Sequence, residues 1–72
     1  MLEHKMITLP DGCLFEGWFD DGMRRGWGVK TYPNGAEYHG LYVNDIRHGV
    51  GIKITADGTQ KHVEYENGIL KT

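Results

Sequence analysis

Four histidines and one cysteine are the side chains of this 72-residue chain best suited to metal or nucleophilic chemistry. His39 and His62 are 23 residues apart, which is the period of an internal sequence repeat. Equivalent residues of successive repeats are expected to lie two strands apart, at least ~9–10 Å. Zinc needs ligand nitrogens within about 2.1 Å, so these two cannot share one ion within a chain. Cys13 follows a turn, where we expect a buried, small hydrophobic side chain. We predict no metal site and no cysteine nucleophile.

Two Gly-x-Gly segments, at residues 26–28 and 49–51, are the features most similar to a phosphate-binding loop. Both lack the third glycine of a dinucleotide fingerprint, no helix is expected after them, and no lysine of a nucleotide-binding loop follows. Most carboxylates lie in turns, which they stabilise, and the chain contains no serine. We therefore predict a protein that is not an enzyme and that uses no cofactor.

Basic side chains recur at the same spacing of 23 residues: Arg24 and Arg47, Lys30 and Lys53, and Arg25, His48 and Lys71. One interpretation is a solvated strand edge that discourages aggregation. The other is a stripe that binds an acidic protein segment or phosphate headgroups. The net charge of −2 gives no support to a general role in binding nucleic acid or anionic membranes. We expect no nucleic-acid partner, and membrane phospholipid stays a minor alternative.

Turn-forming residues divide the chain into short segments. Glycine makes up 11 of 72 residues, about twice its average share, and it stands beside aspartate, asparagine or proline, as in Asp21-Gly22 and Pro33-Asn34-Gly35. The segments between these turns are rich in β-branched and aromatic residues, and none carries a long helical pattern. We predict an all-β fold: an antiparallel meander of about six short strands, stacked as β-hairpins in a single twisted and curved sheet.

A chain of 72 residues allows one small domain of marginal stability. Without a metal or a disulfide, such a domain needs regular packing, a partner or self-association. A single cysteine favours a reducing compartment, and neither a signal-peptide core nor a membrane span is evident. We expect a cytoplasmic location, with association to membrane or cytoskeleton left open.

The chain overlays on itself when it is shifted by 23 residues. Phe15 then falls on Tyr38, Phe19 falls on Tyr42, and three glycines coincide with three others. These structural glycines are Gly17, Gly26, Gly28, Gly40, Gly49 and Gly51. The period divides the single domain 1–72 into a leading half repeat (1–14), repeat one (15–37), repeat two (38–60) and a trailing partial repeat or cap (61–72).

The repeat resembles the MORN (membrane occupation and recognition nexus) family, whose pattern is aromatic-x-Gly-x-aromatic, then basic-Gly-x-Gly and a turn that ends in glycine. Residues 15–28 and 38–51 carry this pattern, although Asp45 replaces a turn glycine and Val63 replaces the glycine of a third aromatic motif. The resemblance implies elongated hairpin arrays that act as scaffolds and peptide-binding grooves. Some family members have been linked to phosphoinositide membranes.

Two-residue loops at Asp21-Gly22 and Asn44-Asp45 predict the pairing of the strands. They place Gly17 opposite Gly26, Phe15 opposite Gly28, and Tyr38 opposite Gly51. A three-residue loop at Pro33-Asn34-Gly35 keeps both repeats facing the same way.

One face then alternates aromatic rings with glycine. Arg24 stands opposite Phe19 and Arg47 opposite Tyr42, so the guanidinium groups can lie over rings. We predict that this face is a groove for a peptide or helix of a partner protein, formed by Phe15, Phe19, Tyr38, Tyr42, Tyr65, Arg24 and Arg47.

The opposite face is also apolar, and one sheet cannot leave two apolar faces in water. We expect curvature to fold one face inward and the other to meet another molecule. The predicted self-association face consists of Trp18, Trp27, Leu41, Val50, Ile52 and Ile54. Trp27 and Leu41 are expected to be cross-strand neighbours on it.

Three functions remain open. We favour a non-catalytic scaffold or interaction module that binds a protein segment, forms a homodimer, or does both. The alternatives are a phosphoinositide headgroup-binding module and a regulatory repeat segment of a larger enzyme.

Overall fold

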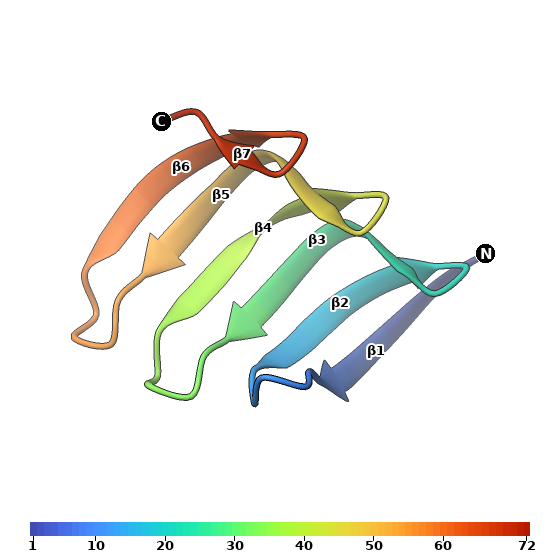
Figure 1. Ribbon diagram of the computed structural model, residues 1–72, viewed down its shortest axis with the longest axis horizontal. Coiled ribbons are helices and arrows are strands. Elements are labelled where there is room, and N and C mark those ends of the chain that lie inside the picture. The colour runs from blue at the N-terminus through green and yellow to red at the C-terminus, as the bar shows by residue number, and fades with distance from the viewer.

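A computed structural model describes residues 1–72 as one open antiparallel sheet in which the strands follow each other in chain order (Figure 1). The strands are β1 (Leu2–Thr8), β2 (Leu14–Asp20), β3 (Met23–Thr31), β4 (Glu37–Val43), β5 (Ile46–Ile54), β6 (Gln60–Glu66) and β7 (Ile69–Leu70). The predicted all-β meander is confirmed. It has seven strands rather than about six because the turn at Asn67 and Gly68 returns the chain into the two-residue β7. The structure contains no helix that is long and apolar enough to cross a membrane.

The turns alternate between two types along the sheet. At one end, two-residue loops join β2 to β3, β4 to β5 and β6 to β7, and both residues of each loop have positive φ. This conformation matches the twist of the flanking strands. At the other end, Tyr32 N donates to Ala36 O at 2.8 Å, which encloses the three-residue loop 33–35, with Gly35 at φ 91°. The predicted loops are therefore confirmed.

The pairing of β2 with β3 differs from the prediction beyond the turn. Phe19 pairs with Arg24 as predicted, but Gly17 pairs with Gly28 and Phe15 with Lys30. The predicted Phe15–Gly28 and Gly17–Gly26 pairs are wrong.

The same slip occurs in repeat two, where Tyr38 pairs with Lys53 and not with Gly51. A bulge causes it: the register shifts between Gly40 and Tyr42, near Gly49, which has φ 103° on the facing strand. The bulge adds two residues to the longer strand. Because side chains alternate with a period of two, a slip of two residues leaves every side chain on its predicted face.

Aromatic rings pack directly on glycine backbone. A Cβ atom added to Gly28 would lie 2.7 Å from Cε1 of Phe15, and one added to Gly51 would lie 2.8 Å from Cε1 of Tyr38. The expected contact between a ring and a glycine therefore forms, but with a diagonal neighbour of the ring rather than with the residue directly opposite it. No side chain other than hydrogen fits beneath either ring.

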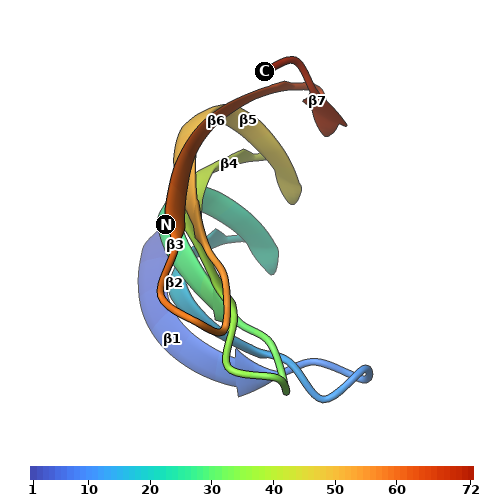
Figure 2. The same cartoon turned by 90° about the vertical axis from the view of Figure 1, so that its left-hand side faces the viewer.

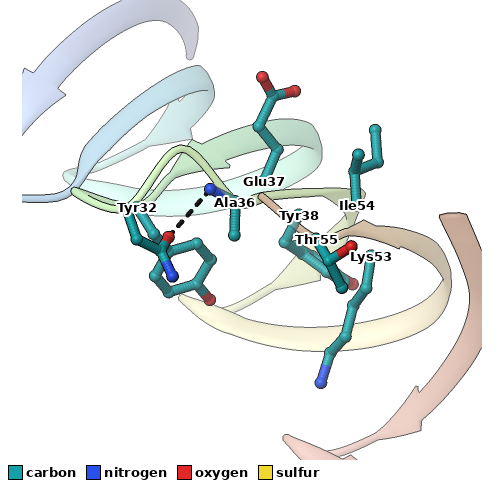
Figure 3. A pocket seen from close by; sticks show the side chains of 8 residues that line it. Tyr32, Ala36, Glu37, Tyr38, Lys53, Ile54 and Thr55 are labelled. Carbon is teal, nitrogen blue, oxygen red and sulfur yellow. Dashed lines mark hydrogen bonds between the residues drawn. The ribbon is translucent and has the colours of Figure 1, made fainter. Parts of the chain in front are cut away.

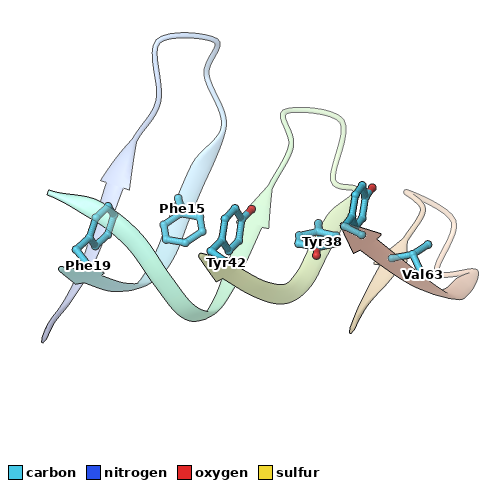
Figure 4. Packing of buried hydrophobic residues seen from close by; sticks show 6 residues of the cluster. Phe15, Phe19, Tyr38, Tyr42 and Val63 are labelled. Atoms are coloured by element: carbon cyan, nitrogen blue, oxygen red, sulfur yellow. The ribbon is translucent and has the colours of Figure 1, made fainter. Parts of the chain in front are cut away.

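The buried core is a row of side chains along the sheet: Phe15, Phe19, Tyr38, Tyr42, Val63 and Tyr65 (Figure 4). Successive rings meet edge to face, with centroids 5.1 Å apart for Phe15 and Tyr42 and 5.7 Å apart for Tyr38 and Tyr65. Each such pair contributes about 0.5–1.5 kcal/mol beyond the burial of its area. The strands bend to one side, so the sheet is curved (Figure 2). The rings fill the inside of this curve, which we call the concave face.

The regular pattern ends at both edges of the sheet. Lys5 of β1 stands opposite Gly17, where the repeat has glycine, and its Nζ lies 5.0 Å from the centre of the Phe19 ring. In β6, Lys61 stands where the repeats have Phe15 and Tyr38. Only two rings, those of Phe15 and Tyr38, therefore lie on glycine backbone from two neighbouring strands, one ring in each full repeat.

We predict that Gly28→Ala destabilises the domain by about 1–3 kcal/mol, because its methyl group overlaps the Phe15 ring. Gly22→Asn should change the free energy of unfolding by less than about 0.5 kcal/mol, since nothing lies near Gly22 and asparagine tolerates positive φ. Urea denaturation measures both. Adding Phe15→Ala to Gly28→Ala should give less than the sum of the single effects. Fully additive effects would contradict the ring-on-glycine contact.

The hydroxyl of Tyr38 is buried without a hydrogen-bond partner, and burial raises the pKa of Tyr38 to about 12 from 10.0. Because the pKa of Tyr38 is higher in the folded chain than in the unfolded chain, its contribution to stability is fully present below about pH 10. That contribution is lost as the pH rises from about 10 to about 12. We predict that Tyr38→Phe is neutral or stabilising by up to about 1 kcal/mol at neutral pH. The variant should also lose less stability than the wild type between pH 10 and 12, as measured by urea denaturation across that range. Marked destabilisation of Tyr38→Phe at neutral pH would show that the hydroxyl has a partner.

Candidate functional site

The concave face carries most of the positive charge of the protein. Directly opposed residues share a face, and by this rule six cations lie here: Lys5, Arg24, Lys30, Arg47, Lys53 and Lys61. Among the carboxylates, those of Glu3 and Asp45 lie on the same surface and that of Glu37 borders it. The chain as a whole has a net charge of −2. Folding therefore separates the charges and makes the inside of the curve basic.

Arg24 is held by the turn between β4 and β5. Its Nε donates to Oδ1 of Asp45 at 2.7 Å, its backbone N donates to the same oxygen at 3.1 Å, and its NH2 group donates to the Asp45 carbonyl. The guanidinium also lies 4.9 Å from the centre of the Tyr42 ring. Although burial by itself raises it, the pKa of Asp45 is lowered by these bonds from Arg24. Asp45, which replaces a turn glycine of the repeat pattern, thus joins the two repeats.

Arg47 is the equivalent of Arg24 in repeat two, and its surroundings are different. Its guanidinium lies 4.1 Å from the centre of the Tyr38 ring. It donates to the hydroxyl of Tyr32 at 2.6 Å and to that of Tyr65 at 3.0 Å. Burial alone would lower the pKa of Arg47, but its contacts with Tyr32 and Tyr42 raise it above its ordinary value. Arg47 is therefore always charged, and it forms no ion pair with a carboxylate.

Two hollows open along β4 and β5. One, of about 310 Å³, is lined by Arg24, Lys30, Tyr42, Asp45, Ile46, Arg47, Tyr65 and Gly68. The other, of about 230 Å³, lies towards the three-residue loops, where Tyr32, Ala36, Tyr38 and Lys53 line it (Figure 3). Tyr38 and Lys53 form a cross-strand pair at one hollow, and Tyr42 and Arg47 form one at the other. The two hollows therefore succeed each other along the strands.

The five aromatic residues predicted to form a groove are the core of the domain. Phe15, Phe19, Tyr38, Tyr42 and Tyr65 are between 0 and 6% exposed. The predicted pairs Arg24–Phe19 and Arg47–Tyr42 are confirmed.

The guanidinium groups of these arginines cover neighbouring rings and leave little of them to a partner. Binding of a protein segment to this set of residues stays a prediction.

The structure adds three side chains to the predicted set. Lys30 and Lys53 lie 5.1 Å and 5.8 Å from the ring centres of Tyr32 and Tyr65, and the Tyr32 hydroxyl contacts Arg47. Lys30 follows Gly28 by two residues along β3, and Lys53 follows Gly51 by two residues along β5. This alternation was the signal that could have placed both lysines on this face.

The opposite, convex face exposes large apolar side chains, and the register places a few charged residues between them, such as Glu16 opposite Val29 and Glu64 opposite Val50. Its exposed large side chains are Met6, Leu14, Trp18, Met23, Trp27, Val43, Ile46 and Val50. Of the predicted self-association residues, Trp18, Trp27 and Val50 are 42–58% exposed, and Leu41, Ile52 and Ile54 are partly buried. The predicted pairing of Trp27 with Leu41 is confirmed. Self-association itself stays a prediction.

The histidines and the cysteine have structural contacts of their own. His39 Nε2 lies 2.6 Å from Glu37 Oε1, His4 meets the Trp18 ring edge to face, and His48 Nδ1 accepts from Asn67 N. Cys13 is buried, and burial raises the pKa of its thiol. No three His, Cys, Asp or Glu residues lie close enough together to hold a metal ion.

Comparison with known proteins bears on the repeat. None of the curated proteins compared with the chain matches it. The family model of the MORN repeat matches twice, at residues 15–37 and 38–60, which are the two full repeats predicted from the 23-residue period. Together these matches cover more than half of the chain, and each includes one ring-on-glycine contact and one arginine over aromatic rings. The chain belongs to the MORN repeat family.

Proposed function

We propose that this domain is a non-catalytic interaction module that binds an extended protein segment along its concave face. The observation that carries the proposal is the row of two hollows over β4 and β5. Of the cations that line them, Arg24 is paired with Asp45, whereas Lys30, Arg47 and Lys53 form no ion pair. Four residues separate Tyr38 from Tyr42 along β4, which is roughly 13 Å of extended chain. A segment of about four to six extended residues would therefore reach both hollows.

The packing of the core explains how such a module could bind a segment without changing its conformation. Because the rings are already packed against glycine and against each other, the floor of the concave face is preformed and rigid. A preformed surface loses little conformational entropy when it binds. The basic rim, rather than the rings, then supplies the contacts that select a partner, and it also speeds encounter with an acidic one.

Self-association through the convex face is a second candidate, favoured by the exposure of Trp18, Trp27 and Val50. Tryptophan is enriched among the residues that dominate the energy of interfaces. Two copies stacked sheet to sheet, about 10 Å apart, would bury this surface. The convex and concave faces are independent, so a dimer would leave both concave faces free.

We predict that peptides selected from a random library on the wild-type domain occupy the hollow beside Ala36. Ala36→Trp fills that hollow and should weaken binding at least tenfold, about 1.4 kcal/mol. The matched control is Ala56→Trp, because Ala56 is the other alanine of the chain, lies in the exposed loop 56–58 and does not line the hollow. Fluorescence anisotropy measures both affinities. Equal binding by the two variants, or a library that yields no binder, would overturn the proposal.

We predict a concentration-dependent dimer that Val50→Lys abolishes, because burying an unpaired ammonium group costs more than the apolar contact gains. Val50 is 58% exposed, so the variant should keep the β-sheet circular dichroism spectrum. Thr72→Lys adds the same charge at the chain end and should leave the dimer intact. Light scattering at about 100 μM, where a weak dimer is populated, gives the masses. A wild type that stays monomeric there removes this candidate.

A further inference from the structure

The two repeats place an arginine at the same position but give it different partners. Arg24 bonds the carboxylate of Asp45, the second residue of the β4–β5 turn. The equivalent residue of the next turn is Gly68, whose backbone N donates to Arg47 O just as Asp45 N donates to Arg24 O. The backbone arrangement is thus repeated, but the carboxylate is missing. Arg47 keeps the position of Arg24 and lacks its anion.

The positive charge of Arg47 is held partly buried by neutral groups alone. Its two terminal nitrogens donate to the hydroxyls of Tyr32 and Tyr65, and its Nε, the atom with which Arg24 binds Asp45, forms no hydrogen bond. Buried charges in proteins are generally paired with an opposite charge. The hydroxyls orient the guanidinium without neutralising it, so Arg47 is fixed in place with three of its five N–H donors free, that of Nε among them.

Other cations surround Arg47 without compensation. Lys30, Lys53 and Lys61 form no ion pair, and Lys53 stands directly opposite Lys61 across β5 and β6. Like charges in such a pair repel each other. The carboxylates near this face are engaged elsewhere: Asp45 with Arg24 at 2.7 Å, Glu3 with Lys5 at 3.9 Å, and Glu37, which lines the other hollow, with His39 at 2.6 Å. The concave face therefore has an excess of positive charge that an anion from outside would relieve.

The hollow beside Arg47 has room and an unused polar atom. It measures about 310 Å³, and Tyr42, which lines it, has a buried hydroxyl without a hydrogen-bond partner. Burial raises the pKa of Tyr42, so its hydroxyl keeps its proton and can donate at neutral pH. A carboxylate in this hollow would lie among the donors of Arg47, Lys30 and Tyr42.

We infer that the concave face binds an acidic protein segment, and that one of its carboxylates takes beside Arg47 the place that Asp45 takes beside Arg24. This inference rests on the proposed function and names the chemistry of the partner. The Arg24–Asp45 pair shows within the same molecule that this position accepts a carboxylate. The shape favours a peptide over a membrane, because cations inside a curve are held away from a flat bilayer, whereas an extended chain can lie within it.

The test is to give Arg47 its own carboxylate. Gly68→Asp recreates the turn of repeat one, and the backbone tolerates it, since Asp45 has φ 73° and Gly68 has φ 85°. A Cβ at Gly68 meets only Ile46, at 3.9 Å. The internal carboxylate should compete with the ligand. Gly68→Asn is the matched control, because it has the same shape and no charge.

The probes are peptides of about eight glutamates or eight glutamines, long enough to cover both hollows, titrated at low salt and followed by fluorescence anisotropy. We expect the glutamate peptide to bind the wild type and Gly68→Asn within threefold of each other. Gly68→Asp should bind it at least tenfold more weakly, and added salt should weaken all binding. The glutamine peptide should not bind. Asp45→Gly, which frees Arg24, should bind the glutamate peptide more tightly than the wild type.

Three outcomes would overturn the inference. They are equal binding of the two peptides, no loss of affinity in Gly68→Asp, and binding to vesicles that contain a phosphatidylinositol phosphate but not to the glutamate peptide. Failure of the proposed function is a separate result. Library peptides that need the hollow beside Ala36 but are neutral or basic would leave the module intact and refute only its acidic partner.

Discussion

The contact between an aromatic ring and a glycine backbone is the constraint on which this structure depends. A single sheet of 72 residues has no second layer, so its apolar surface must be buried against the sheet itself. Phe15 and Tyr38 achieve this by lying where any Cβ would clash, over Gly28 and Gly51. The neighbouring rings pack edge to face on them. Without those glycines the rings would stand in solvent, and the sheet would have no core.

The same contact decides which groups are free to bind. Because the rings are used as core, the groups left accessible on the concave face are the side chains that cover them, and these are mainly cations. Lysines and arginines can extend their apolar stems over the rings and keep their charge accessible. The chain is slightly acidic overall, yet its curved interior is basic, because the curvature gathers cations that the sequence distributes over four strands. The apolar convex face has no such cover and remains a separate surface.

The two repeats share a backbone and differ in chemistry. Phe15 and Tyr38 occupy equivalent positions of the two repeats, but only Tyr38 has a hydroxyl, which is buried without a hydrogen-bond partner. Asp45 and Gly68 are the second residues of two equivalent turns. Because only Asp45 has a carboxylate, Arg24 is ion-paired and Arg47 is not. At both edges a lysine replaces a member of the ring-on-glycine contact, so the core does not continue beyond Phe19 and Tyr65. A regular scaffold thus carries one site that is not repeated.

The sequence by itself determined the strands, the turns, the repeat and the two faces, because these follow from local rules: positive φ at Asp21-Gly22, a bulge-forming glycine at Gly35, and alternation with a period of two. Only the tertiary structure decided the register beyond each two-residue turn. A glycine that forms a bulge, such as Gly49, has the same pattern of neighbours as one that lies flat in a strand. The tertiary structure also decided that the rings are buried and that Arg47 lacks an anion. Burial and pairing depend on residues that are distant in the chain, and curvature brings them together only when all the strands are in place.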